Sequence, residues 1–156
     1  MTGGPTPDDL GWLSRAIDLS RLCPPSPTAY NVGAIVVDAA GAEVVSGYSR
    51  DTGPHLHAEE SALAKVGLGD SRLATATMYS SLEPCTERHS RTPPCAELVL
   101  ASGIRRVVIA WREPGLFVAD CVGVERLREA GITVLELAEL ETAARAVNAH
   151  LRGIAT

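Results

Sequence analysis

Aromatic residues are scarce in this chain of 156 residues, at 4% of the total, and there is a single Phe. The core must therefore be filled mainly by Val, Leu, Ile and Ala, which belong to the 46% of residues that are hydrophobic. That apolar content argues against a disordered chain. Long apolar runs are also lacking, because runs such as residues 34–37 are far too short to cross a bilayer. We therefore expect no membrane partner.

An excess of positive charge is lacking too. The 19 acidic residues outnumber the 14 Lys and Arg residues, which gives a net charge of −5. A protein that neutralises many phosphates needs a broadly basic surface, so we expect no nucleic acid polymer as a partner. Residues 1–9 contain neither a basic region nor an apolar stretch, which argues against a signal peptide. We expect a cytoplasmic protein with a single domain over residues 1–156.

The chain alternates between patterns typical of helices and of strands. Asp8 and Asp9 precede a helical pattern that ends at Cys23-Pro24-Pro25. Strands are predicted at residues 32–37, 43–48, 74–80, 106–111 and 132–137, and further helices at 58–66, 95–101, 122–130 and 140–151. The first two strands are expected to form a hairpin, and strand–helix alternation from residue 74 implies parallel pairing. We predict an α/β fold, with a mixed five-stranded sheet between two helix layers.

Three short pieces of the sequence carry the chemistry. His57-Ala58-Glu59 opens the second predicted helix, Pro84-Cys85 follows the third strand, and Pro94-Cys95 opens the next helix. Two thiolates and one imidazole suit zinc, and a catalytic zinc site leaves its fourth position to water. Residues two apart do not share a helix face, so His57 is expected at or before the helix start. Glu59 would then stand beside the water as a proton shuttle.

The ordered set resembles the zinc deaminase signature His-x-Glu … Pro-Cys-x-x-Cys, except that nine residues separate Cys85 from Cys95. Residues 81–85 (Ser-Leu-Glu-Pro-Cys) and 91–97 (Arg-Thr-Pro-Pro-Cys-Ala-Glu) resemble the pyrimidine deaminase domain of bacterial riboflavin biosynthesis. The similarity continues through residues 103–109 and 127–134. This resemblance implies the cytidine-deaminase fold, one zinc per subunit and at least a homodimer. It also implies that His57, Cys85 and Cys95 are the ligands and that Glu59 is the general acid/base.

The substrate is less clearly indicated. The chain has Thr28-Ala-Tyr-Asn31 where that family usually has Pro-Asn-Pro, and no reductase domain is expected to follow. We therefore expect a small heterocyclic amine, such as a free nucleobase or a related aminopyrimidine or triazine. The alternatives are the riboflavin-pathway diaminopyrimidine nucleotide, and then cytidine or deoxycytidylate. In each case zinc-activated water would replace the exocyclic amine, with Glu59 transferring the proton.

Five further residues are candidates for substrate contacts: Asn31, Ser81, Trp111, Phe117 and Asp120. The Asn31 amide could read a ring edge, or equally stabilise a turn before the first strand. The backbone near Ser81 could orient the amine. Trp111 and Phe117 follow the fourth strand, where an aromatic side chain can stack on a flat ring, although core packing is the default for Trp111. Asp120 could bind an amine.

A structural zinc module that serves in protein interaction is the non-enzymatic alternative. Such a site is closed by four protein ligands, and Cys23, His89 or Cys121 would have to supply the fourth. A thiol redox protein is a third possibility, but the chain lacks a close Cys-x-x-Cys pair. Three protein ligands plus a water would favour the enzyme, and a Glu beside the ligands has no obvious role in the structural alternative.

Overall fold

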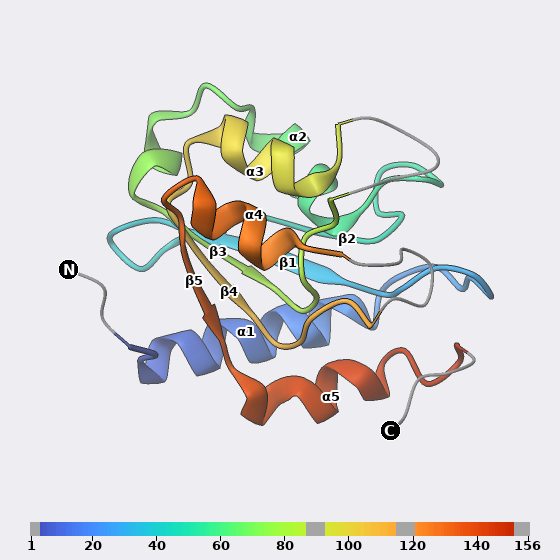
Figure 1. Ribbon diagram of the computed structural model, residues 1–156. Coiled ribbons are helices and arrows are strands. Elements are labelled where there is room, and N and C mark those ends of the chain that lie inside the picture. The colour runs from blue at the N-terminus through green and yellow to red at the C-terminus, as the bar shows by residue number, and fades with distance from the viewer. Residues whose placement is uncertain (1–3, 87–92, 115–120, 152–156) are drawn as a thin grey trace.

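The computed structural model describes residues 4–86, 93–114 and 121–151. It contains a five-stranded sheet with the strand order β2-β1-β3-β4-β5 (Figure 1). The strands are β1 (Gly33–Val37), β2 (Glu43–Tyr48), β3 (Thr77–Ser80), β4 (Arg106–Ile109) and β5 (Thr133–Glu136). β1 is antiparallel to both β2 and β3, whereas β3 and β5 are parallel to β4. The predicted mixed sheet is confirmed.

Helices cover both faces of the sheet (Figure 1). One face carries α1 (Pro7–Ser20) and α5 (Glu141–Ala146), and the other carries α2 (Ala58–Val66), α3 (Cys95–Ser102) and α4 (Gly123–Glu129). Each face has its own hydrophobic core. Ile35 and Val108 pack on the α1 side, whereas their neighbours Val36 and Val107 pack on the α2 side. Successive strand residues point to opposite faces, as strand geometry requires. The structure therefore has the three layers that the sequence predicts.

Local capping explains where two of the helices begin and end. The Thr6 hydroxyl accepts a hydrogen bond from the Asp9 backbone N–H over 3.2 Å, and the Asp9 carboxylate accepts one from the Thr6 N–H over 2.9 Å. This capping box starts α1. At the other end of a helix, Gly103 has a φ of 85° and stops α3, because glycine enters the left-handed region without steric strain.

The third strand and the last helix differ most from the sequence prediction, and β4 also ends two residues earlier than predicted, at Ile109. Residues 74 and 75 were predicted to begin a strand, but Ser71–Thr75 form a 3₁₀ turn. The Asp70 carboxylate caps this turn by accepting the Arg72 N–H over 2.9 Å. The last helix was predicted to continue to residue 151, but α5 is shorter. The side-chain amide of Asn148 donates to the Ala144 carbonyl over 3.2 Å, and it replaces the backbone donor that a longer helix would provide there.

Gly47 allows β2 to lie close against α2. A Cβ atom at this position would lie 2.6 Å from the Ala62 nitrogen and 2.8 Å from the Ala58 oxygen. Real side-chain atoms do not approach the backbone this closely. The missing side chain therefore determines how near α2 lies to the sheet, and α2 is the helix that begins with the predicted site residues.

A partly buried ion pair lies at the end of the sheet where β3 and β4 begin. The Arg106 guanidinium donates to both carboxylate oxygens of Asp9, over 2.8 and 2.7 Å. The Tyr79 hydroxyl donates to the same carboxylate over 2.7 Å. Asp9 is 2% exposed, so these partners replace the water that the charge loses on burial.

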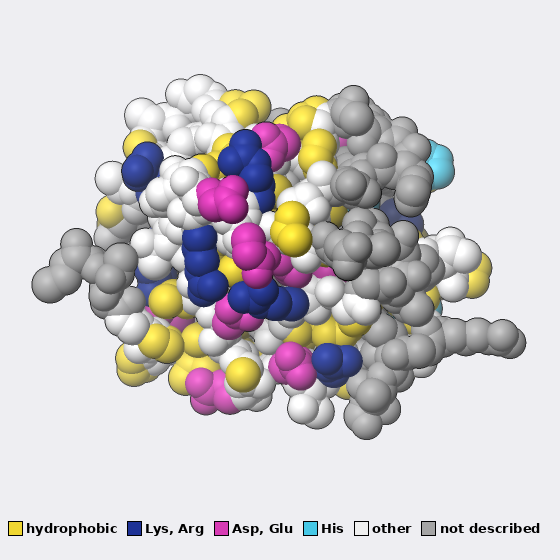
Figure 2. All heavy atoms as spheres, viewed as in Figure 1, with side chains coloured by type: hydrophobic (Ala, Val, Ile, Leu, Met, Phe, Trp, Pro, Cys, Tyr) yellow, Lys and Arg dark blue, Asp and Glu magenta, His cyan; other side chains and the backbone are white. Residues whose placement is uncertain are grey.

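Acidic and basic side chains alternate on the face that carries α4 and β5 (Figure 2). Arg112 pairs with both Glu125 and Glu136, and Arg126 pairs with Glu97. This mixing of signs leaves little net field over that face. None of the helices in the described parts of the chain is long and apolar enough to span a membrane.

Candidate functional site

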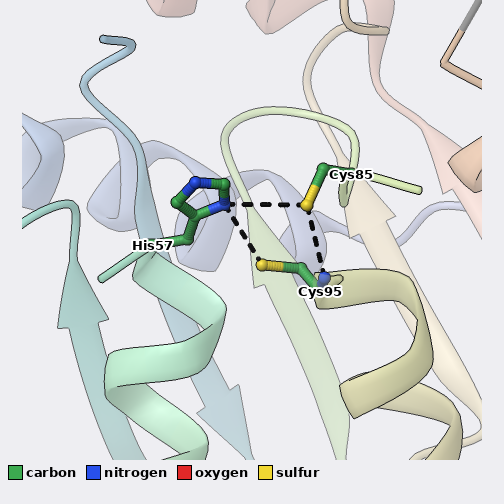
Figure 3. Close-up of side chains that lie close together, drawn as sticks. All are labelled: His57, Cys85 and Cys95. Atoms are coloured by element: carbon green, nitrogen blue, oxygen red, sulfur yellow. Dashed lines mark hydrogen bonds between the residues drawn. The ribbon is translucent and has the colours of Figure 1, made fainter. Parts of the chain in front are cut away.

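The start of α2 places His57. His57 is the N-cap residue, with φ −79° and ψ 164°, and its backbone N–H donates to the Glu60 carboxylate over 3.3 Å. This extended backbone turns the imidazole away from the helix and toward the start of α3 (Figure 3). The prediction that His57 lies at the helix start is confirmed.

Two cysteines approach the imidazole from neighbouring elements (Figure 3). Cys85 lies in the segment after β3, and Cys95 is the first residue of α3. His57 Nδ1 lies 3.6 Å from Cys85 Sγ and 3.4 Å from Cys95 Sγ. The Cys95 backbone N–H also donates to Cys85 Sγ over 3.3 Å. The structure therefore brings together the three residues that the sequence predicts to be ligands.

The donor set and its spacing fit zinc. Zn–S bonds of about 2.3 Å and Zn–N bonds of about 2.0 Å place the N and S atoms of a tetrahedral site about 3.5 Å apart. The two N–S distances here, 3.6 and 3.4 Å, agree with that value. All three ligand atoms lie within 4.8 Å of one another, and no other group of this kind occurs in residues 4–86, 93–114 and 121–151.

The electrostatics of the site favour a thiolate at Cys85. The pKa of its thiol is lowered to about 4, first by the side-chain hydrogen bond with Cys95 and then by His57, against the effect of burial. A thiolate is the form that binds metal. The free thiols outside the group differ, because burial raises the pKa of Cys23 and raises that of Cys121 to about 11.

The other proposed sources of a fourth ligand contact different atoms. Cys23 Sγ lies 3.6 Å from the Val32 carbonyl oxygen, and Cys121 Sγ lies 3.8 Å from the Pro84 carbonyl oxygen. Neither belongs to the group of converging ligand atoms among the described residues. His89 lies outside the described residues. The group as described thus has three protein ligands, the number typical of catalytic rather than structural zinc.

Glu59 is a buried carboxylate beside this group. It is 4% exposed, and the Ser80 hydroxyl donates to its Oε1 over 2.5 Å. Burial raises the pKa of Glu59, while the hydrogen bond from Ser80 and the nearby His57 act in the opposite direction. Sequence reasoning did not single out Ser80. Its only signal was its position at the end of a predicted strand, next to Ser81.

Glu83 holds together the segments around Cys85. Its carboxylate accepts the backbone N–H of Glu113 over 2.9 Å and that of Val124 over 2.8 Å. Gly123 allows this packing, because a Cβ there would lie 2.0 Å from the Pro84 oxygen. Glu83 therefore ties the loop after β4 and the start of α4 to the residues that precede Cys85.

Two candidates for substrate contact have other partners in the structure. The Ser81 hydroxyl accepts the Gly33 N–H over 3.1 Å, and the Ser81 N–H donates to the Gly33 oxygen over 3.0 Å. Trp111 is 2% exposed; the Tyr30 ring lies perpendicular to it, with 6.2 Å between the ring centroids, and the Arg145 guanidinium lies 4.6 Å from the Trp111 ring centroid. These contacts give both residues a structural role, and their contact with substrate stays a prediction.

Of the three remaining candidates for substrate contact, only Asn31 lies within the described residues. The Asn31 amide oxygen accepts a hydrogen bond from Arg50 over 2.6 Å, and the Asn31 N–H donates to Asn148 Oδ1 over 2.7 Å. Phe117 and Asp120 lie outside the described residues. Arg50 was missed by sequence reasoning, because nothing in the local pattern indicates a contact between residues 19 apart.

A comparison with protein families gives one match over most of the chain. The family described as the cytidine and deoxycytidylate deaminase zinc-binding region matches residues 7–111. This stretch runs from the start of α1 to Trp111 and includes all four residues of the proposed centre, namely His57, Glu59, Cys85 and Cys95.

Individual relatives include riboflavin biosynthesis proteins. RibD of Aquifex aeolicus is 43% identical over 144 residues, which cover 90% of this chain and 37% of that protein. The diaminohydroxyphosphoribosylamino-pyrimidine deaminase of Schizosaccharomyces pombe is 38% identical over 80% of this chain and 31% of that protein. The structure of Acinetobacter baumannii RibD (form 2) aligns with a TM-score of 0.76 and 34% identity, over 90% of this chain and 38% of that one. The chain spans about a third of the length of the curated relatives it matches.

Proposed function

Because this chain belongs to the cytidine and deoxycytidylate deaminase family, we propose that it is a zinc-dependent hydrolase that removes an exocyclic amine from an aminopyrimidine. The observation that carries the proposal is the convergence of one imidazole and two cysteine sulfurs within 4.8 Å, with the buried carboxylate of Glu59 two residues from His57. His57, Cys85 and Cys95 would hold the metal, and Glu59 would move the proton.

The relatives favour a nucleotide as the substrate. The S. pombe protein is named for a diaminohydroxypyrimidine that carries a phosphoribosylamino group. We therefore propose this diaminopyrimidine nucleotide as the substrate class. These relatives do not confirm the free nucleobase that the sequence led us to expect as substrate. Free nucleobases are therefore included among the compounds tested below.

Zinc at this position would supply a Lewis acid that makes water nucleophilic near neutral pH. Glu59 takes the proton from the attacking water and delivers it to the ring nitrogen next to the reacting carbon. Glu59 then takes the remaining proton from the new hydroxyl group and gives it to the departing amine as the C–N bond breaks, so that one water and one C–NH2 group give one C=O group and ammonia.

Ser80 supports both protonation states of Glu59. The serine hydroxyl has one proton and two acceptor lone pairs. It lies 2.5 Å from Glu59 Oε1 and 2.9 Å from the Leu82 carbonyl oxygen. When Glu59 is ionised, Ser80 donates to it. When Glu59 is protonated, Ser80 accepts from it and donates to Leu82, so the shuttle always has a partner.

Ammonia release from zinc-loaded protein tests this function. The panel contains the diaminopyrimidine nucleotide, deoxycytidylate, cytidine, cytosine and an aminotriazine. We expect turnover of the nucleotide, with one zinc per chain by elemental analysis. Turnover confined to the unphosphorylated rings would overturn the substrate class. Absence of release from every compound by zinc-loaded protein would overturn the enzyme itself.

A matched pair of cysteine variants tests the ligand assignment. Cys85→Ser removes a proposed ligand, so zinc content and ammonia release should both fall to background. Cys23→Ser changes a thiol outside the group and should keep both, because Cys23 is not among the converging ligand atoms and its Sγ lies 3.6 Å from the Val32 carbonyl oxygen. Equal zinc loss in the two variants would refute the assignment.

A homodimer is part of the proposal, since the resemblance to the riboflavin deaminases implies one. Light scattering coupled to size-exclusion chromatography should give twice the chain mass of 16.4 kDa. A single-chain mass at micromolar concentration would contradict it.

A further inference from the structure

Arg50 has a backbone conformation that its residue type disfavours. Its φ is 62°, and it is the one non-glycine residue with a positive φ within residues 4–86, 93–114 and 121–151. A side chain in this region costs about 1 kcal/mol or more and persists only where surrounding contacts enforce it. Arg50 follows β2 at the start of the loop that leads to His57, so the strain lies beside the site.

The contacts of Arg50 join two segments of the site. Its backbone N–H donates to the carbonyl of Leu56, the residue before His57, over 2.7 Å. Its guanidinium donates to Pro24 O over 2.7 Å and to Tyr30 O over 3.2 Å, in the segment before β1. Arg50 thereby connects the loop that carries His57 to the segment that carries Asn31.

The same guanidinium determines which way the Asn31 amide points. Arg50 Nη2 lies 2.6 Å from Asn31 Oδ1. A guanidinium can only donate hydrogen bonds, so the oxygen of the amide must face Arg50 and the NH2 group must face away. The amide orientation thus follows from chemistry, without the usual ambiguity between its O and N atoms.

The backbone of Asn31 is held from the opposite side. Asn148 is 1% exposed, and its amide accepts the Asn31 N–H over 2.7 Å and donates to the Asn31 carbonyl over 3.1 Å. Among the described residues, the Asn31 NH2 group has no hydrogen-bond acceptor. The group is not one of the fully buried atoms, so it is accessible. The backbone and the amide oxygen of Asn31 are therefore held in place, and its two N–H donors are available to a ligand.

Asn31 lies at the end of the sheet where β1 begins and β3 ends, which is the end near Cys85. It lies two positions before Gly33, the first residue of β1, and the Gly33 N–H donates a hydrogen bond to the Ser81 hydroxyl. The neighbouring Ser80 donates to Glu59. Asn31 is therefore linked to the proton shuttle through its chain neighbours and the side-chain hydrogen bonds of Ser81 and Ser80, and Arg50 links it to the residue before His57.

We infer that Arg50 is a positioning residue that makes Asn31 a hydrogen-bond donor to the ring, so that the site selects a heterocycle with an acceptor there. This inference rests on the proposed deaminase function. A carbonyl oxygen or an unprotonated ring nitrogen satisfies the NH2 group. An amino group at the same position would leave two donors facing each other, which is the kind of mismatch that discriminates strongly between substrates.

A double-mutant cycle on substrate binding tests the coupling. Arg50→Lys keeps the charge but loses the planar fork that reaches Asn31 and the two carbonyls. We expect this change and Asn31→Ala each to raise KM about tenfold, with kcat changed less than threefold. In the Asn31→Ala background, Arg50→Lys should add less than a further twofold. Independent, multiplying effects, or a fall in kcat alone, would overturn the inference.

Two further variants serve as controls. Asn31→Asp keeps an acceptor for Arg50 but removes the NH2 donors, so KM should rise while the folded protein is retained. Arg72→Lys makes the same chemical change at an exposed arginine that bonds only to Asp70 among the described residues. It should leave KM and kcat at wild-type values. A similar KM for Asn31→Asp and wild type would show that the donors do not contact the substrate.

A readout without turnover separates this inference from the proposed function. In ¹⁵N-labelled protein, the Asn31 side-chain NH2 signals are identified by their loss in Asn31→Asp. In Arg50→Lys these signals should move toward the position of an unstructured amide and exchange faster with water, while Arg72→Lys leaves them in place. Unchanged signals in Arg50→Lys would refute the positioning role. If wild type releases no ammonia, the function fails, and the NH2 signals still decide the role of Arg50.

Discussion

Two adjacent carboxylates at the start of α2 have different environments. Glu59 is 4% exposed, and its partner is the hydroxyl of Ser80. Glu60 is half-buried and accepts the backbone N–H of His57. Burial raises the pKa of Glu59, which brings it closer to the value at which a carboxyl group can both take up and release a proton near neutral pH. The first carboxylate is suited to proton transfer and the second to capping.

This difference in environment predicts that a Glu→Gln substitution lowers kcat at position 59 but not at position 60. Glu59→Gln should lower kcat by about 10²- to 10⁴-fold, because the amide cannot shuttle a proton. Zinc content and the urea midpoint should not fall, since the amide still accepts from Ser80. Glu60→Gln should keep near wild-type kcat, because Gln serves in a capping box as Glu does. Near wild-type ammonia release by Glu59→Gln would contradict the assigned role.

At the level of elements, contact between β2 and α2 determines where the site forms. Gly47 faces the backbone of α2, and a Cβ there would lie 2.6 Å from the Ala62 nitrogen. A shift of α2 would move both His57 and Glu59 relative to the two cysteines. The position of the helix therefore affects stability and the geometry of the site together.

Gly47→Ala should lower the free energy of unfolding by about 1–3 kcal/mol, because the added methyl group forces α2 away from the sheet. Gly11 provides the matched control. It lies on the exposed side of α1, and a Cβ there meets nothing within 4 Å. Gly11→Ala should raise the free energy of unfolding by about 0.5–1 kcal/mol through helix propensity. Urea titration of both variants checks the pair, and equal effects would disprove the packing explanation.

The elements were predictable where local sequence determines them. The range predicted for the second strand, 43–48, and that for the helix at 58–66 agree with β2 and α2, because turn residues and a glycine bound them directly. The predicted start of β3 was wrong because the Asp70 carboxylate accepts the Arg72 N–H and caps a 3₁₀ turn, which residue patterns do not distinguish from a strand. The predicted end of α5 was wrong because the side-chain amide of Asn148, rather than a backbone N–H, donates a hydrogen bond to the Ala144 carbonyl.

The site was predictable to the same extent. The approach of His57, Cys85 and Cys95 followed from ligand chemistry and from the elements on which they lie. The roles of Ser80 and Arg50 could not be predicted in this way. Their partners, Glu59 and Asn31, are distant in sequence, and serine or arginine has no pattern that indicates such a contact.

At the level of the whole molecule, the ion pair of Asp9 and Arg106 joins the first helix to the fourth strand. Burial alone would raise the pKa of Asp9, but hydrogen bonds from Arg106, Tyr79 and Thr6 together hold it well below its usual value. The folded state therefore binds this proton less readily than the unfolded chain does. By linkage, the pair stabilises the fold above the unfolded pKa of about 3.9, and this stabilisation is lost as pH falls further.

Acid titration of stability tests this account. Asp9→Asn should lower the free energy of unfolding at pH 7 by about 1–3 kcal/mol, because Arg106 loses its charged partner. The difference from wild type should shrink as pH falls below about 4, where the unfolded wild-type chain becomes protonated. Asp8→Asn, in the exposed first turn of α1, should change stability by less than about 0.5 kcal/mol. A gap between Asp9→Asn and wild type that does not depend on pH would contradict the prediction.

The ion pair and the metal ligands lie at opposite ends of the short strands β3 and β4. Arg106 and Thr77 begin these strands, whereas the residues that lead to Cys85 follow the end of β3. Four residues of strand separate the two ends, about 13 Å of protein. Thermal stability and catalytic rate can therefore be changed by substitutions at different ends of these strands. Substitutions at the Asp9 end can change the melting temperature while the residues of the proposed site at the other end stay the same.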